Sequence, residues 1–354
     1  MKKKLSFFCL FLLAMMSCRK DIVLSDRPEN VFRSFWKIMN ENYPYFEEKG
    51  IDWDSVYSTC YTRAKNTRLK EDLLNIFEEI LEMVKDKQLR IECGRYFDGM
   101  GISYDPPYYS VIPVDWDNEG NGFSRTYYHY QILQDTTKKY VYYDILFFYE
   151  GNIKAFDNVV NSNNYRNGII LDIRNNYSPG YGVYGVISYD KMIDEMIQFV
   201  SIFFADEITA YYESHQNGKG TSNFSTKRPK TISGRGWISD NLPVIVLVSQ
   251  YTNLTATLFT QIMKRLPNCI VIGEKTSGCS IGDTQITILP NSWRLLCPIN
   301  ITKRYDLDGK NIDFGVEPDI YARQIYHSDK DTATNRKDST LIKAIQVLDS
   351  INGF

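Results

Sequence analysis

The amino-acid sequence predicts an α/β fold built on a mostly parallel sheet. The strongest indication is a strand–turn–helix–strand unit within residues 242–278. Its first strand, 244–248, is a continuous apolar run, which is typical of a strand buried on both faces. A polar turn over 249–253 follows, then a helix that ends before Pro267 and a second apolar strand over 269–272. Because open α/β sheets bind ligands at the carboxyl ends of their strands, we expect the functional site at these turns.

The second indication is the alternation of strands and helices through residues 144–325. Apolar runs at 145–148 and 168–174 predict strands, and the stretches 155–160 and 191–204 predict helices. This order predicts a single α/β core with a mostly parallel sheet.

The remaining parts of the C-terminal half are more polar. A segment rich in Gly, Ser and Lys at 213–236 predicts an exposed loop. A β-rich stretch follows, in which Asp308-Gly309 is expected to form the turn of a polar hairpin. The C-terminal tail, 326–354, is predicted to contain a last helix near 339–350.

A small helical domain is predicted ahead of the core, over residues 28–92. Val31, Phe35 and Ile38 fall at helical spacing and define its first apolar face. The region 93–143 is rich in Tyr, Gly and Asp with short alternating runs, so we expect it to be a β-rich connection. With 354 residues the chain can bury a large core.

The amino terminus has the pattern of a targeting signal. Lys residues at 2–4 precede an apolar stretch at 5–16, which is shorter than the roughly 20 residues of a spanning helix. The sequence AMMSC at residues 14–18, where this stretch ends, resembles a bacterial lipobox, which implies lipidation of Cys18. We therefore expect a lipoprotein signal over 1–18, a tether over 19–27, and a membrane-anchored protein of the bacterial cell envelope, periplasmic or surface-exposed. The alternative is an ordinary cleaved signal with a chance cysteine.

Composition narrows the classes of partner. The formal net charge of −2 gives no reason to expect nucleic acid. The 26 Tyr and 19 Phe residues suit a surface that grips peptides or sugars, although core packing explains many of them equally well. The cysteines beyond Cys18 are too irregularly spaced for a zinc site, so we expect no metal there. We expect no cofactor either. They are Cys60, Cys93, Cys269, Cys279 and Cys297.

Other candidate sites have simpler explanations. Residues 180–185 match G-x-G-x-x-G but begin several residues after their strand, so a dinucleotide site is not expected. Asp306, Asp308 and Asp313 lack the Gly and the final Glu of an EF-hand loop. The histidines are most simply surface residues, although any of them is an alternative base. They are His129, His215 and His327.

Several short stretches, in this order, resemble the S41 family of serine peptidases, which includes the C-terminal processing (tail-specific) and tricorn-core proteases. The resemblance implies a crotonase/ClpP-like spiral β-α core preceded by a small N-terminal helical domain, with no clear PDZ insert. It also implies serine-type endopeptidase activity on extended or unfolded polypeptide, through a covalent acyl intermediate. The matching stretches are 32–57, 84–91, 168–176, the unit at 242–278 with its VIGEKTSG segment, and 314–320.

The resemblance also identifies the nucleophile position. Family members place a serine in the turn after the central strand, and an ungapped alignment puts Leu254 there. Leucine has no nucleophilic atom. Thr255 is the alternative nucleophile if the turn is shifted by one residue, and Ser249 and Thr252 lie farther away.

The positions of the base and the acid are altered to different degrees. Cys279 stands where processing proteases carry a lysine, and Gln88 stands where tricorn-like members carry a histidine. Asp313 matches the family's acidic residue ahead of G-V-x-P-D. Cys279 is alternatively a replacement nucleophile, although a small apolar side chain is the simpler explanation. Lys275 is most simply a solvated charge.

The oxyanion and substrate-binding positions that the resemblance implies are Ser178, Gly180, Thr276 and Gly278. Pro179 lies between the first two and lacks an N–H donor. Three catalytic elements are therefore altered, which favours a catalytically degenerate member over an active one. The alternative is a non-catalytic binding protein that holds a peptide by β-addition, or a glycan by aromatic side chains, in the same cleft.

Overall fold

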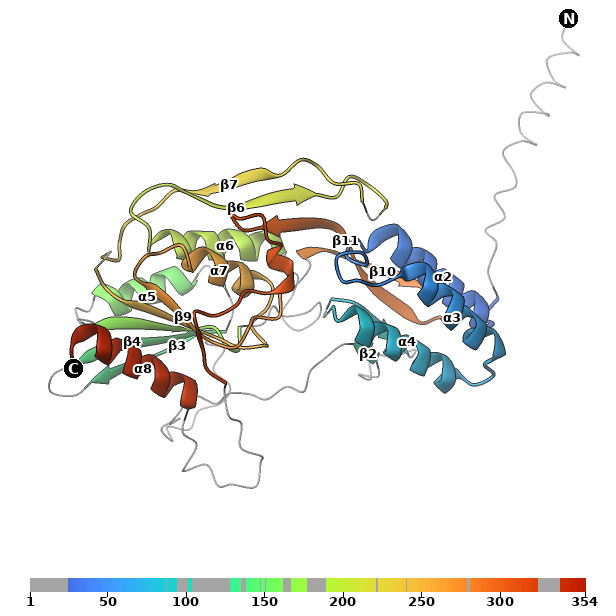
Figure 1. Cartoon of the computed structure of the whole chain (residues 1–354), viewed down its shortest axis with the longest axis horizontal. Helices are drawn as coiled ribbons and strands as arrows, with labels where there is room; N and C mark the ends of the chain where they lie inside the picture. Colours follow the sequence, from blue (N-terminus) through green and yellow to red (C-terminus); the bar gives the residue numbers. More distant parts are fainter. Residues whose placement is uncertain are drawn as a thin grey trace, which may run out of the picture.

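The computed structural model contains an α/β core joined to a helical region by long strands (Figure 1). No helix among its described residues is long and apolar enough to cross a membrane. The structure describes residues 25–86, 88–93, 101–103, 128–134, 138–146, 148–149, 151–161, 167–176, 189–220, 222–239, 241–278, 281–323 and 338–354.

The helical region consists of α2 (Pro28–Asn42), α3 (Trp53–Asn66) and α4 (Lys70–Val84), which confirms the predicted helical N-terminal region. Helix α2 begins with a proline, whose fixed φ suits the first turn. Helix α3 begins at Asp52, whose carboxylate accepts from Ser55 N at 3.0 Å. Aromatic rings fill the space between the three helices.

The helical region shares its apolar core with two strands from far along the sequence. Strand β11 (Arg294–Tyr305) pairs with β10 (Ile281–Ile288) and with the short β1 (Arg90–Glu92), which also pairs with β2 (Gly101–Ser103). Side chains of β11 and its preceding turn are buried against the helices, including Leu295 and Trp293. Burying each such side chain contributes roughly 1.5–3 kcal/mol, so the helices depend on this sheet for their stability.

The central sheet of the α/β core is mostly parallel, as predicted. Its strand order is β12-β9-β8-β5-β4-β3, and only the β3–β4 pair is antiparallel. Strand β8 lies in the middle of this sheet, and Val246 pairs with Leu171 on one side and with Val271 on the other. The strands are β3 (Tyr128–Gln134), β4 (Lys139–Ile145), β5 (Gly168–Asp172), β8 (Val244–Val248), β9 (Cys269–Gly273) and β12 (Ile320–Tyr321).

Helices cover both faces of this sheet (Figure 1). Val244 and Val246 face the side of α5, α6 and α7, whereas Ile245 and Leu247 face α8. This burial on both faces is why β8 is a continuous aliphatic run rather than an alternating one. The helices are α5 (Gly151–Asn161), α6 (Tyr189–Ser201), α7 (Thr255–Met263) and α8 (Ser339–Asn352).

A buried ion-pair network connects α8 to the sheet. The Arg174 guanidinium, after β5, donates to the carboxylates of Asp172 and Asp338. Asp338 also caps α8, since its carboxylate accepts from Leu341 N at 2.9 Å. The GIILDIRNN stretch therefore has a structural role in this chain.

The predicted exposed loop at 213–236 is wrong. Strand β6 (Ile208–His215) and β7 (Arg228–Ile232) form an antiparallel hairpin there. One face of the hairpin is solvated, so its strands carry the polar residues that suggested a loop. Only the tip is irregular, and it contacts α2 through Gly220 N, which donates to Glu41 O at 2.7 Å.

The predicted strand at 145–148 is also wrong in its position. Strand β4 ends at Ile145 and starts at Lys139, so most of it lies within the region predicted to be a β-rich connection. Its tyrosines are buried on alternating faces of the sheet, Tyr142 toward α8 and Tyr143 toward α5 and α6. Strand β5 and helix α6 likewise end before their predicted limits, at Asp172 and Ser201. The division of the chain into domains stays a prediction, and most of residues 93–143 lie outside the described part.

Candidate active site

The turn between β8 and α7 has an unusual backbone. Leu254 has φ 48° and ψ −120°, a conformation that non-glycine residues adopt at a cost of about 1–3 kcal/mol. Its N–H donates to Gly278 O at 3.4 Å, and the neighbouring Asn253 forms an isolated bridge with Gly278. The Leu254 side chain is buried in the core. The chain therefore makes a tight strand-to-helix turn beside the end of the VIGEKTSG segment.

Hydroxyl groups of this turn are used to hold its shape. Ser249 Oγ donates to Arg174 O at 2.7 Å, and Thr252 Oγ1 donates to Ile173 O at 2.9 Å. Thr252 Oγ1 also accepts from Ser249 N at 3.0 Å. Both side chains are fully buried, so they anchor the turn to the end of β5 instead of facing a substrate.

Thr255 is the first residue of α7, and its side chain is only 2% exposed. An attacking hydroxyl must reach a carbonyl carbon of the substrate. In this structure the Thr255 side chain is surrounded by protein.

Two glycines bring together the two segments that follow β9 and β11. Gly278 has φ +70°, and a Cβ added there would lie 2.1 Å from Asp313 O. Gly315 has φ +91°, and a Cβ there would lie 2.1 Å from Thr276 O. Thr276 Oγ1 accepts from Val316 N at 2.8 Å. These segments are thus packed backbone to backbone, and the Thr276 hydroxyl is engaged in joining them.

Asp313 lies where the core meets the helical region, in the short 3-10 helix η1 (Ile312–Phe314). Its carboxylate accepts from Tyr45 Oη at 2.7 Å and from Arg304 N at 3.3 Å. Burial raises the pKa of Asp313 to about 7, although the Arg304 charge and the bond from Tyr45 act in the opposite direction. Asp313 is therefore the one candidate residue whose described surroundings tune it for proton exchange near neutral pH.

Gln88 lies in the turn between α4 and β1, where its N–H donates to the Asp86 carboxylate at 3.0 Å. Asp86 in turn accepts from Tyr43 Oη at 3.0 Å. The buried amide oxygen and nitrogen of Gln88 have no hydrogen-bond partner among the described residues. An amide at this position cannot act as the base that a histidine would provide.

The structure unites the candidate positions only in part. Leu254, Gly278 and Asp313 meet through their backbones, whereas no hydrogen bond joins Gln88 to them within the described ranges. Lys275 forms a half-exposed ion pair with Glu317 at 3.1 Å, which leaves it on the surface. Four predicted positions lie outside the described residues, namely Cys18, Ser178, Gly180 and Cys279.

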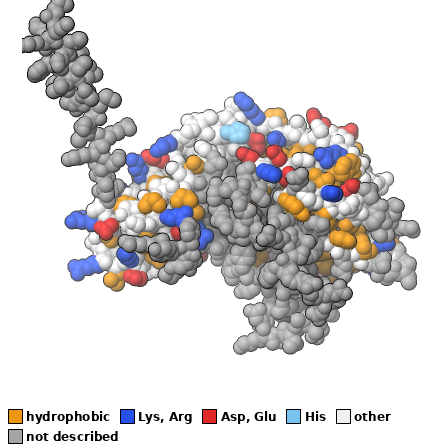
Figure 2. All heavy atoms as spheres, turned by 180° about the vertical axis from the view of Figure 1, so that it is seen from behind, with side chains coloured by type: hydrophobic (Ala, Val, Ile, Leu, Met, Phe, Trp, Pro, Cys, Tyr) orange, Lys and Arg blue, Asp and Glu red, His pale blue; other side chains and the backbone are white. Residues whose placement is uncertain are grey.

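Charges of both signs are mixed on the surface. On the face in Figure 2, Lys and Arg side chains of the described residues are interspersed with Asp and Glu. Across the described parts of the chain, no three His, Cys, Asp or Glu side chains are grouped as a metal site would require.

Two residues that matter at the site were not identified from the sequence. Tyr45 is almost fully buried, and its hydroxyl contacts Asp313 across 268 positions of sequence. Arg174 supplies the carbonyl that holds Ser249. The available signal was the need of a buried tyrosine hydroxyl for a partner, but the sequence does not identify that partner.

Comparison with known proteins places the chain in a family. The profile of peptidase family S41 matches residues 140–322, and that of the tricorn protease C1 domain matches residues 25–82. The chain belongs to peptidase family S41, as the sequence motifs predicted. No curated protein matches it by sequence.

Solved structures agree with this membership. A candidate peptidase from Parabacteroides merdae superposes with a TM-score of 0.69 and 25% identity, covering 92% of this chain and 97% of its own. Mature CPAF superposes with a TM-score of 0.62 and 10% identity, covering 93% and 99%. The tricorn protease superposes with a TM-score of 0.50 and 15% identity, covering 92% of this chain and 37% of its own. The last two similarities concern the fold alone.

Proposed function

We propose that this S41 protein binds extended or unfolded polypeptide in the bacterial cell envelope, and that its peptidase activity is weakened or lost. The observation that carries this proposal is Leu254. It occupies the tight turn between the central strand and α7, in a backbone conformation with positive φ. Strained strand-to-helix turns of this kind present the nucleophile in other hydrolases. Here the turn has the backbone of a nucleophile position and the side chain of a core residue.

The neighbouring groups support the same conclusion. Thr255 is buried, Lys275 is paired with Glu317, and Gln88 is an amide without acid–base function. Asp313 alone keeps a carboxyl suited to proton transfer. An acid without a nucleophile does not complete an acyl-transfer site.

Polypeptide is favoured over glycan by the edge strand β10. Among the described strands β10 pairs only with β11, and it leaves Ile286 and Ile288 exposed at 43% and 61%. The edge strand β7 instead carries Arg228, Pro229 and Lys230, the kind of residues that discourage strand addition. Strand β10 follows the VIGEKTSG segment closely, so a peptide added to it would lie near the candidate site.

Hydrolysis of an unfolded model protein by the purified chain from Arg19 onward tests the loss of activity. We expect no cleavage by the native chain and none by Thr255→Ala, while the same protein is bound saturably by both. Cleavage by the native chain that Thr255→Ala abolishes would overturn the proposal and identify the nucleophile. Leu254→Ser serves as the matched gain-of-function variant, since it places a nucleophilic hydroxyl at the position of the turn where the native chain has none.

The membrane anchor is a separate proposal that is supported by the lipobox-like sequence before Cys18. Expression of the full chain in bacteria with labelled palmitate should label the native protein and not Cys18→Ser. Labelling that persists in Cys18→Ser, or release of the native chain into the soluble fraction, would contradict the anchor.

A further inference from the structure

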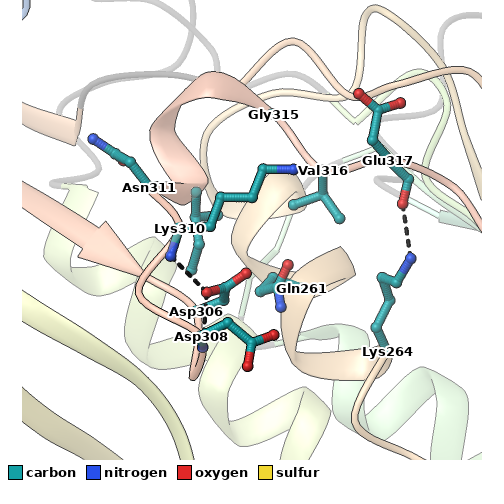
Figure 3. Close-up of a pocket in the computed structure, with 10 residues that line it drawn as sticks. Gln261, Lys264, Asp306, Asp308, Lys310, Asn311, Gly315, Val316 and Glu317 are labelled. Carbon is teal, nitrogen blue, oxygen red and sulfur yellow. Dashed lines mark hydrogen bonds between the residues drawn. The ribbon is translucent and has the colours of Figure 1, made fainter. Parts of the chain in front are cut away.

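A pocket of about 220 Å³ lies beside the C-terminal half of α7, between that helix and residues 306–317 (Figure 3). Its floor is apolar, because Ile312 and Val316 line it and are each only 4% exposed. A water molecule occupies roughly 30 Å³ of liquid, so the pocket has room for about seven. It is smaller than the roughly 300 Å³ at which pockets for drug-sized ligands begin, and so it suits a small molecule.

Some of the charged groups around the pocket already have partners within the protein. Lys264 Nζ donates to Glu317 O at 2.8 Å and pairs with the Asp319 carboxylate at 2.6 Å. The Asp306 carboxylate accepts two backbone N–H groups of its own turn. These contacts fix the rim, and a ligand would have to compete with them to bind there.

Three other polar side chains of the pocket have no such contacts. The Gln261 amide, the Asp308 carboxylate and the Lys310 ammonium make no hydrogen bond or ion pair with any described residue. Figure 3 shows the Lys310 side chain running along the pocket toward Val316, with Gln261 and Asp308 below it. A positive group, a negative group and an amide thus face one small space above an apolar floor.

We propose that this pocket binds a small zwitterion that carries a free α-carboxylate and a free α-ammonium group, either an amino acid or a dipeptide. The carboxylate would pair with Lys310 and the ammonium with Asp308, as charge-assisted hydrogen bonds. Gln261 would bond to a peptide group, and a short apolar side chain would lie on Ile312 and Val316. None of these roles requires that the chain hydrolyse peptides.

The position of the pocket gives the ligand a second effect. One wall is α7, which starts at the Leu254 turn, and the other includes Ile312 and Gly315, on either side of Asp313. A ligand that bridges the two walls stabilises the folded chain by mass action. The stabilisation grows with the logarithm of the ligand concentration above Kd, so the melting temperature should keep rising after the pocket is saturated.

Calorimetric titration of the purified chain with alanyl-alanine tests the proposal. We expect saturable binding of alanyl-alanine that is weakened roughly tenfold or more by Lys310→Ala, because a charged hydrogen-bond partner is lost. Asp308→Asn should weaken it comparably. Alanyl-alanine amide, which lacks the carboxylate, should bind Lys310→Ala and the native chain equally. N-acetyl-alanyl-alanine, which lacks the ammonium, should likewise not distinguish Asp308→Asn from the native chain.

Lys343→Ala is the matched control, because Lys343 is an exposed lysine on α8, which covers the opposite face of the central sheet from α7. It should bind alanyl-alanine like the native chain. Titration with alanine distinguishes the two sources of the zwitterion, since tighter binding of alanine assigns a free amino acid and tighter binding of alanyl-alanine assigns a short peptide. No heat of binding up to roughly 10 mM, where even millimolar affinity saturates, would overturn the proposal. Equal affinities for the native chain, Lys310→Ala and Asp308→Asn would do so as well.

Discussion

The two ends of α7 differ in how their polar groups are used. At the N-terminal end, the hydroxyls of Ser249 and Thr252 are buried and bonded to backbone atoms of the preceding segment. At the C-terminal end, Gln261 faces a pocket with Asp308 and Lys310, and these three make no contact of that kind within the described chain. The end that resembles a catalytic turn is thus organised as a structural element, and the end that resembles no known site has polar groups available for a ligand.

The largest expected effect on stability concerns the backbone packed beside the N-terminal end of α7. Gly315→Ala should lower the free energy of unfolding by roughly 3–5 kcal/mol, because its φ of +91° is strained for alanine and the new methyl meets Thr276 O. Denaturant unfolding followed by circular dichroism measures the change. Gly218→Ala is the control, since that glycine also has positive φ but an added Cβ would meet nothing within 4 Å. We expect it to cost about 1 kcal/mol. Equal losses would show that the close approach at Gly315 is absent.

A smaller effect is expected for the hydroxyls of the turn itself. Thr252→Val keeps the shape of the side chain but removes both hydrogen bonds of Oγ1, so it should cost roughly 2 kcal/mol in the same unfolding experiment. Thr231→Val, on the exposed side of β7, removes a solvated hydroxyl and should change stability by less than about 0.5 kcal/mol. If Thr252→Val leaves stability unchanged but abolishes peptide binding, the turn is a functional surface. The N-terminal end of α7 would then not be purely structural, and the contrast with its C-terminal end would be wrong.

The smallest expected effect is the pH dependence contributed by Asp313. Its pKa is raised from an unfolded value of roughly 4 to about 7, so between these values the folded chain holds one more proton than the unfolded chain. This contribution to stability is therefore present at low pH and is lost as the pH rises through about 7. Between pH 6 and pH 8 the loss amounts to about 1.4 kcal/mol.

Asp313→Asn has no carboxyl at this position, so its stability should lack this dependence on pH. We therefore subtract the unfolding free energy of the variant from that of the native chain at pH 6 and at pH 8. The change in this difference between the two pH values measures the contribution of Asp313. A difference that is constant with pH would show that the pKa of Asp313 is unshifted. A difference of the opposite sign would show that the Arg304 charge and the hydrogen bonds to the Asp313 carboxylate outweigh its burial.

The sequence was most informative where burial of apolar side chains alone determined the local structure. The aliphatic run of β8 needed burial on both faces, and this pattern alone predicted a buried strand in a mostly parallel sheet. The β6–β7 hairpin was missed because its solvated face carries Lys, Arg and Thr, which are equally common in loops. The region that contains β4 was expected to be β-rich, but the bounds of β4 were not predicted, since the polar tips of its tyrosines concealed residues that are buried on both faces of the sheet.

The candidate site was predictable in its segments but not in its contacts. Family motifs identified the Leu254 turn, the VIGEKTSG segment and the stretch around Asp313, and the structure brings these three together. The positive φ of Leu254 and the bond from Tyr45 to Asp313 depend on packing between distant parts of the chain. Neither this backbone conformation nor this hydrogen bond can be predicted from the neighbouring sequence.

The shared core of α2–α4 and β11 has a consequence for the order of synthesis. Helices α2 to α4 end at Val84, whereas the strand that completes their core begins at Arg294. Truncation after residue 290 should therefore leave these helices sensitive to protease, and a stable, protected helical fragment would contradict that dependence. A chain that emerges from the ribosome, or from a membrane pore, amino end first must carry three incompletely buried amphipathic helices until most of its length is made. During that interval it presents the kind of exposed apolar surface that chaperones bind.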